Sequence, residues 1–193
     1  MLATLGNSTD DIEIITRSDR VEALLEPYRG AIGHDYDGYR GHIYRVLSYA
    51  MHFLGGDDTA RGVVETALVY HDLGLWSDKE LAYLEPSIER AQHDNSSESW
   101  GYDPQLLHDT IYWHHKVTPF RGPNADIVNA VRKADWIDAT AGIVRMGMPK
   151  RGIEKATDVI PAAGFYDTLR RIGPELTGSA LGTVAGLLKV CKL

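Results

Sequence analysis

The sequence is poor in cysteine and has no excess of positive charge. Its single cysteine, Cys191, cannot form a disulfide within the chain, so we expect a protein of a reducing compartment such as the cytoplasm. Lysine and arginine number 20 against 27 aspartate and glutamate residues, a formal net charge of -7. Because non-specific nucleic-acid binding needs a basic surface, this balance argues against nucleic acid as a partner. A small anionic substrate remains compatible with it, since a bound divalent metal supplies local positive charge.

Long hydrophobic runs are also absent. No apolar stretch approaches the roughly 20 residues that a membrane-spanning helix needs, so we expect no membrane association. The opening segment MLATLGNSTDDIEI has neither the basic nor the apolar region of a signal peptide. What is present is a chain of 193 residues, 44% apolar and 24% charged, which is ordinary for a soluble globular protein and long enough for one domain with a substantial core.

Apolar residues recur at helical spacing along most of the chain, and no strand pair, internal repeat or low-complexity segment stands out. The glycine-rich segment 30–41 and the polar segments 94–99 and 117–124 are predicted to be loops. The apolar stripes predict helices near 19–28, 39–54, 58–72, 77–80, 86–95, 104–114, 125–146, 150–160, 162–172 and 175–191. The predicted N-caps are Ser18, Asp58, Asp103 and Asn124, and residues 77–80 form a predicted capping box. We therefore predict an all-α protein, with residues 1–193 forming a single compact helical bundle.

One dipeptide, His71-Asp72, is unusual in its position. Val64, Leu68 and His71 follow one another at helical spacing, so the histidine should lie on the buried face of its helix. A buried imidazole beside a carboxylate requires either hydrogen-bond partners or a metal ion.

Other predicted helices carry similar groups on their apolar faces, namely His42, His114 and Asp135. A carboxylate on an apolar face is costly unless it is paired or bound to a metal. Each group alone has an ordinary explanation, such as a hydrogen-bonded core histidine, or an ion pair of Asp135 with Arg132 or Arg45. Their joint occurrence on successive helices favours a metal site inside a helical bundle.

In chain order, His42, His71-Asp72 and Asp135 resemble the His…His-Asp…Asp pattern of the HD-domain superfamily of metal-dependent enzymes. The segments GHIYRVLSYA, VYHDLGL and RKADWIDA resemble the motifs of that family in order. The resemblance implies an HD-like core over residues 37–147. Additional helices in 148–193 would cover the site or form a homodimer surface. The resemblance also implies one or two bound divalent transition-metal ions, such as Mn, Fe, Ni, Co or Zn.

Such a metal lowers the pKa of a bound water and polarises a phosphoryl oxygen. The resemblance therefore implies a phosphohydrolase acting on a small phosphorylated metabolite or nucleotide. One branch of the superfamily uses two iron ions for O2-dependent cleavage, so a di-iron oxygenase with a small, phosphonate-like substrate is the first alternative. An HD protein that only binds a partner is the second, although all four motif positions are intact.

The histidines between the HD dipeptide and the last aspartate bear on whether the site holds one metal ion or two, and the sequence leaves both alternatives open. Members of the family with a dinuclear site carry histidines there, and this chain has His93, His114 and His115. The histidine that normally opens the next helix is replaced by Glu85, for which we predict a role as oxygen ligand or general base. His93 ranks below Glu85, and Asp72 is expected to act in catalysis as well as to bind metal.

Three further residues are candidates for binding the substrate. Lys116, beside the histidine pair, and Arg45 could hold an anionic group, although a solvated cation is the commoner role of each residue type. Tyr36, flanked by glycines, is a candidate for closing over the site.

Overall fold

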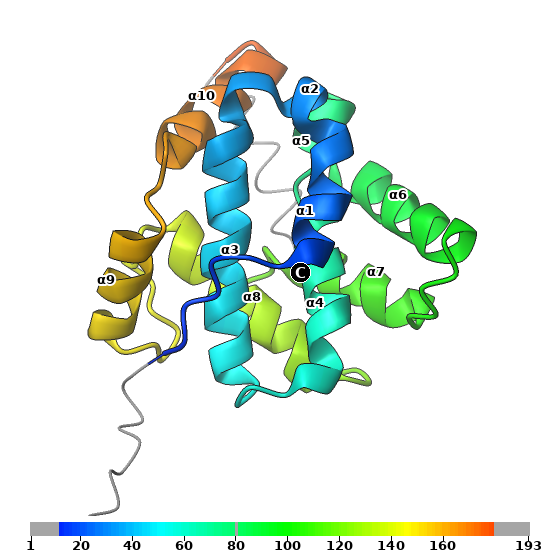
Figure 1. Cartoon of the computed structure of the whole chain (residues 1–193). Coiled ribbons are helices and arrows are strands. Elements are labelled where there is room, and N and C mark those ends of the chain that lie inside the picture. The colour runs from blue at the N-terminus through cyan, green and yellow to red at the C-terminus, as the bar shows by residue number, and fades with distance from the viewer. Residues whose placement is uncertain (1–11, 80, 180–193) are drawn as a thin grey trace, which may run out of the picture.

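The computed structural model describes residues 12–79 and 81–179, which are helical without a strand, so the all-α prediction is confirmed for this part of the chain (Figure 1). The elements in order are α1 (Asp19–Leu25), η1 (Glu26–Tyr28), α2 (Arg29–Ile32), η2 (Gly33–Asp35), α3 (Tyr36–Phe53), α4 (Asp58–Tyr70), α5 (Gly74–Ser77), α6 (Leu84–Ser97), α7 (Pro104–Trp113), α8 (Ala125–Ala139), α9 (Lys150–Val159) and α10 (Phe165–Thr177). No helix in the described ranges has the length and apolarity needed to cross a membrane.

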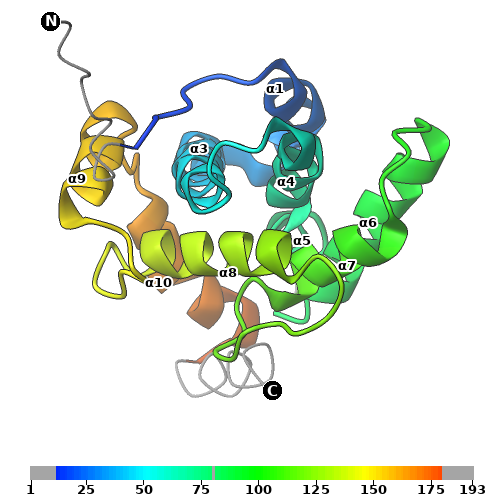
Figure 2. The same ribbon diagram turned by 90° about the horizontal axis from the view of Figure 1, so that it is seen from below.

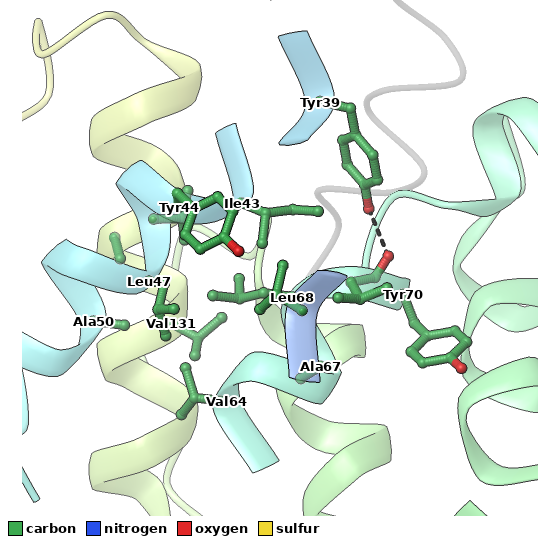
Figure 3. Close-up of a cluster of buried hydrophobic side chains, with 14 of the residues drawn as sticks. Tyr39, Ile43, Tyr44, Leu47, Ala50, Val64, Ala67, Leu68, Tyr70 and Val131 are labelled. Atoms are coloured by element: carbon green, nitrogen blue, oxygen red, sulfur yellow. Dashed lines mark hydrogen bonds between the residues drawn. The ribbon is translucent and has the colours of Figure 1, made fainter. Parts of the chain in front are cut away.

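The centre of the fold is the contact among α3, α4 and α8. Figure 2 looks along α3 and α4, and α8 lies across both of them. Their apolar stripes meet in the cluster shown in Figure 3, where Leu47 of α3, Leu68 of α4 and Val131 of α8 are each fully buried. Burying one such side chain stabilises the fold by roughly 1.5–3 kcal/mol. This core fixes the three helices that carry most of the polar groups discussed below.

Local capping signals predicted several helix starts correctly. Ser18 accepts a hydrogen bond from the amide of Val21 at the start of α1. Asp103 accepts one from the amide of Gln105, and a proline follows it at the first position of α7. In each case the side-chain oxygen satisfies an amide that the helix itself leaves unpaired.

Two predicted caps are wrong. The cap of α4 is Asp57, one residue before the predicted Asp58, and its carboxylate accepts from the amide of Thr59. Asn124 precedes α8, but its backbone is left-handed at φ 57° and its side chain makes no capping bond. An N-cap side chain reaches the first free amides from an extended backbone, and Asn124 does not have one.

The segment 30–41 is helical, not a loop. It contains most of α2, all of η2 and the beginning of α3, which starts at Tyr36 and therefore includes two glycines, Gly38 and Gly41. Glycine lowers helix propensity, so the pattern alone favours a break. The helix persists because the chain near Pro161 packs directly on these glycines, as described below.

Other predicted boundaries were also wrong. The capping box at 77–80 opens no helix: Ser77 ends α5 and donates to the carbonyl oxygen of Leu73, while residue 80 lies outside the described residues. Helix α6 continues to Ser97, through residues predicted as a loop. Helix α8 ends at Ala139 instead of near residue 146, because the following turn has left-handed backbone at Ala141 and Gly142.

The C-terminal elements α9 and α10 lie along the same side of α3 (Figure 1). Helix α10 is joined to the start of α3 through Asp35, whose carboxylate accepts from Thr168 and from Arg171 at 2.7 Å each. One hydrophobic cluster includes residues from Ile12 to Ile172. The prediction of a helix over 175–191 falls largely outside the described residues. The division into an HD-like core and additional helices stays a prediction.

Candidate metal centre

Residues from several elements converge on one buried cluster, which we call the His/Asp cluster. Its members are His42 from α3, His71 and Asp72 just after α4, His114 and His115 just after α7, and Asp135 from α8. All of them except His115 are at most 3% exposed. The side chain of His115 is 21% exposed, so it marks the side on which the cluster meets the surface.

Three histidines of the cluster direct the same ring atom inward. The Nδ1 atom of His71 is 2.7 Å from the carbonyl oxygen of Leu68, and that of His114 is 2.5 Å from the carbonyl oxygen of Ile111. A carbonyl only accepts, so Nδ1 carries the proton and Nε2 faces the cluster with its lone pair. His42 follows the same rule with a different acceptor, the carboxylate of Asp138 at 2.7 Å.

The two carboxylates of the cluster each divide their oxygens between different histidines. Oδ1 of Asp135 is 3.3 Å from Nε2 of His42, and Oδ2 is 3.1 Å from Nδ1 of His115. Oδ2 of Asp72 is 3.3 Å from Nε2 of His71, and Oδ1 is 3.3 Å from Nε2 of His114. Both carboxylates therefore lie between two sets of nitrogen atoms.

Several of these atoms lack a hydrogen bond although they are buried. Among the described residues, Oδ1 of Asp72, both carboxylate oxygens of Asp135 and Nε2 of His114 have no hydrogen-bond partner. Leaving such atoms unpaired costs about 1–3 kcal/mol each, and more for a charged group. Imidazole nitrogen together with carboxylate oxygen is a donor set that divalent transition metals bind, so the residues present fit a metal ion.

Three groups of candidate ligand atoms lie within 4.8 Å of one another. The groups are His42, His71 and Asp135; His71, Asp72 and His114; and His114, His115 and Asp135. Because neighbouring groups share members, the cluster offers more than one place for a cation.

The pKa values in the cluster are shifted by the contacts between its carboxylates and its histidines. Burial lowers the pKa values of His42 and His115, but Asp135 outweighs burial and raises them to about 9 and about 10, so without metal both rings carry a second proton that a ligand role requires them to release.

Burial raises the pKa of Asp72, but the neighbouring imidazoles of His71 and His114 outweigh burial and hold this pKa well below its usual range. Burial likewise raises the pKa of Asp135, and the neighbouring His115 outweighs burial and lowers it well below the usual range. Burial and the neighbouring His115 lower the pKa of His114 to about 4. Both carboxylates are therefore ionised at neutral pH.

The structure does not bring Glu85 or His93 to the cluster. Both side chains are exposed on α6, whose opposite face buries Ile88 and Ala91. At the start of α6 the residue that lies against the cluster is instead Tyr83, with its ring centroid 6.2 Å from that of His115. The apolar spacing of α6 already places residues 85 and 93 away from its buried face.

The substrate-binding candidates also lie elsewhere or have other partners. The ammonium of Lys116 is buried, 4.4 Å from the ring centroid of Tyr112. The hydroxyl of Tyr36 donates to Glu26 at 3.3 Å, and the guanidinium of Arg29 lies 3.8 Å above the Tyr36 ring. Tyr36 therefore fastens the start of α3 to η1, and the described contact of the Lys116 ammonium is with the ring of Tyr112.

Arg45 is fully buried and paired with Asp138, a residue that the sequence did not single out. Its Nε and Nη2 atoms donate to the two carboxylate oxygens of Asp138 at 2.6 and 2.8 Å. Asp138 is three residues after Asp135, so the two carboxylates share one face of α8. The three-residue spacing of the two aspartates in ADWID is the sequence signal that could have identified Asp138. The structure shows that Asp138 is the hydrogen-bond partner of His42, a predicted metal ligand.

We compared the chain with models of protein families, with curated proteins and with solved structures, and none of these comparisons gave a match. The buried His/Asp cluster is compatible with the HD resemblance of the motifs, and it does not by itself establish the family.

Proposed function

We propose that this chain is a metal-dependent phosphohydrolase acting on a small phosphorylated metabolite or nucleotide. The observation that supports this most is the position of Asp72 and Asp135, each buried between two sets of histidine nitrogens and each with at least one oxygen that has no hydrogen-bond partner. In this reading His42, His71 and Asp135 hold a first cation. Two neighbouring groups, His71 with Asp72 and His114, and His114 with His115 and Asp135, offer the place for a second cation next to the first. When bound, such cations lower the pKa of water and polarise a phosphoryl oxygen.

The charge of the cluster favours a phosphorylated substrate. Asp72 and Asp135 are ionised and supply two negative charges, since their pKa values are lowered. Two divalent cations carry four positive charges, so about two would remain uncompensated by the carboxylates, and a phosphate group offsets them. The histidines add no charge when they act as ligands, because a coordinating imidazole nitrogen carries no proton.

The exposure of the cluster members also indicates how a substrate would reach the His/Asp cluster. His115 is the member of the cluster with a partly exposed side chain, so a substrate reaches the cluster past its ring. The buried members hold the ligand atoms in place. The backbone carbonyls of Leu68 and Ile111 keep the Nε2 atoms of His71 and His114 directed inward before any metal arrives.

A di-iron oxygenase acting on a small, phosphonate-like substrate is the second candidate. The observation that favours it is the nitrogen-rich donor set, four histidines with two carboxylates, since imidazole ligands suit iron as well as zinc. A non-catalytic HD module is a third reading, and it requires no turnover.

The deciding experiment is elemental analysis of protein purified without added metal, followed by phosphate release from nucleotides and phosphomonoesters with Mn2+. We expect bound transition metal in the wild type and its loss in Asp72→Ala. The control is Asp78→Ala, which removes a carboxylate that pairs with Arg90 on the surface. Stoichiometric metal in Asp72→Ala would refute the site. Two irons per chain, a mixed-valence EPR signal and O2-dependent turnover would replace hydrolysis by oxygenation. Bound metal without turnover of either kind would favour the binding module.

A further inference from the structure

His42 differs from the other inward-facing histidines in what holds its ring. The acceptors for His71 and His114 are backbone carbonyls three residues earlier, which any helix end provides. The acceptor for His42 is the Asp138 side chain, 96 residues away in the sequence and on another helix. The orientation of His42 therefore depends on tertiary structure and on one particular carboxylate.

Both carboxylate oxygens of Asp138 have hydrogen-bond partners. Its Oδ2 atom lies 2.7 Å from Nδ1 of His42 and also accepts from Nη2 of Arg45, while its Oδ1 atom accepts from Nε of Arg45. Asp138 is 2% exposed and Arg45 0%. An ionised carboxylate in this position keeps the proton of His42 on Nδ1.

Arg45 also holds a distant segment of the chain against the His42 ring. Its Nη1 atom donates to the carbonyl oxygens of Ile160 and Pro161 at 3.3 and 3.1 Å. Phe165, at the start of α10, stacks on the ring of His42 with centroids 4.1 Å apart and planes 13° apart. His42 is therefore fixed at its edge by Asp138 and on its face by Phe165.

The close approach of this segment depends on glycine. A Cβ atom at Gly41 would lie 3.1 Å from both Nη1 of Arg45 and the carbonyl oxygen of Pro161. A Cβ atom at Gly38 would lie 3.0 Å from the carbonyl oxygen of Ala163. Such distances are tighter than nine in ten real Cβ contacts, so a side chain at either position would push the neighbouring backbone away, and the two glycines allow residues 160–165 to lie directly on α3.

We propose that Asp138 is a positioning residue for His42, and that Arg45 holds Asp138 in place and fastens residues 160–165 over the His42 ring. As a consequence, the neighbouring cation positions of the cluster differ in their affinity for metal. A carboxylate acceptor makes an imidazole a stronger ligand than a carbonyl acceptor does, so the cation position that includes His42 binds metal more tightly than its neighbour. This proposal rests on the proposed metal-dependent function.

The test variant is Arg45→Met/Asp138→Leu. The two residues are replaced together, because removing one partner of a buried ion pair leaves an uncompensated charge, whereas apolar replacement of both is often tolerated. The matched control is Arg40→Met/Glu22→Leu. It removes a second ion pair of α3, in which Nε of Arg40 donates to Glu22 at 3.0 Å, and neither residue belongs to the His/Asp cluster.

Co2+ is the probe, because its visible spectrum reports both occupancy and coordination. We expect the tighter Co2+ affinity to fall about 10–100-fold in Arg45→Met/Asp138→Leu, and to stay within about threefold of wild type in the control. Arg45→Met/Asp138→Asn should recover part of the loss, since asparagine keeps a carbonyl acceptor for Nδ1–H. Wild-type affinity and spectrum in the Leu variant would overturn the proposal.

A measurement without metal separates this proposal from the proposed function. In metal-free protein, the Nδ1–H proton of His42 should give a slowly exchanging downfield NMR signal, assigned by its loss in His42→Gln. The signal should persist in the Arg40/Glu22 control and disappear in Arg45→Met/Asp138→Leu. Persistence in the latter would overturn the positioning role. A wild type that binds no Co2+ would overturn the proposed function, and the Nδ1–H signal would still decide whether Asp138 holds the ring.

Discussion

The rings of His71 and His114 meet edge to face, with centroids 4.8 Å apart and planes at 86°. Each histidine is the residue immediately after its helix, α4 or α7. The last carbonyls of a helix have no intrahelical partner, and in both cases the Nδ1–H of the histidine supplies one. The ends of two helices thereby direct two Nε2 atoms into the same buried space, without any specialised loop.

The first prediction concerns stabilisation by metal. A cation that binds only the folded chain at 100 times its dissociation constant stabilises it by about 2.7 kcal/mol. For a chain of this size that corresponds to a rise in Tm of roughly 5–10 °C. Differential scanning fluorimetry with EDTA and then with Mn2+, Co2+ or Zn2+ measures the shift. Asp72→Ala should show none, and an equal rise in that variant would place the bound metal elsewhere.

The second prediction separates residues inside the His/Asp cluster from those outside it. His115→Gln should weaken binding of a metal ion by at least about tenfold, because it removes a ligand candidate 3.1 Å from Asp135. Glu85→Gln should leave metal content unchanged, because its side chain is exposed on α6. Equilibrium dialysis followed by elemental analysis makes the comparison. Loss of metal in Glu85→Gln would restore the role that the motif pattern predicts for it.

The third prediction tests the close packing of residues 160–165 on α3. Gly38→Ala should destabilise the fold by about 1–3 kcal/mol, since the new methyl group meets backbone at 3.0 Å. Gly30→Ala is the control, because a Cβ atom there has nothing within 4 Å, and it should be neutral or up to about 1 kcal/mol stabilising. Urea unfolding gives both values. Equal stability of the two variants would mean that the segment does not lie where the structure has it.

The fourth prediction is a pH dependence at Asp35, which is not a member of the His/Asp cluster. Burial raises the pKa of Asp35, but hydrogen bonds from Trp76, Arg171 and Thr168 outweigh burial and lower it below the usual value. A carboxyl group with a lowered folded-state pKa stabilises the fold fully above its unfolded pKa, about 3.9, and the contribution is lost as pH falls through the folded pKa.

Asp35→Asn should therefore destabilise the fold by about 1–3 kcal/mol at pH 7, through lost hydrogen bonds to a charged group. The difference from wild type should shrink as the pH falls below about 4. Urea unfolding of both proteins across this range measures it. A difference that stays constant with pH would show that the ionised state of Asp35 contributes nothing.

Much of the secondary structure and several members of the cluster follow from local sequence. The apolar spacing places His42, His71 and Asp135 on buried helix faces, and Asp103 with Pro104 marks the start of α7. These features depend on residues within one or two turns of each other, so a linear pattern contains them. Their role as metal ligands stays a prediction, now with a geometry to test.

Tertiary structure decided the rest. The helical start of α3 across Gly38 and Gly41 depends on a segment more than 100 residues later, and the pairing of Arg45 with Asp138 spans 93 residues. The exclusion of Glu85 follows from which face of α6 packs inward. A linear pattern contains the chemistry of each side chain. It does not contain the identity of the side chain's partner, which depends on how the helices cross. The energy of a buried charge or of a tight glycine contact is therefore set by atoms of the neighbouring segment.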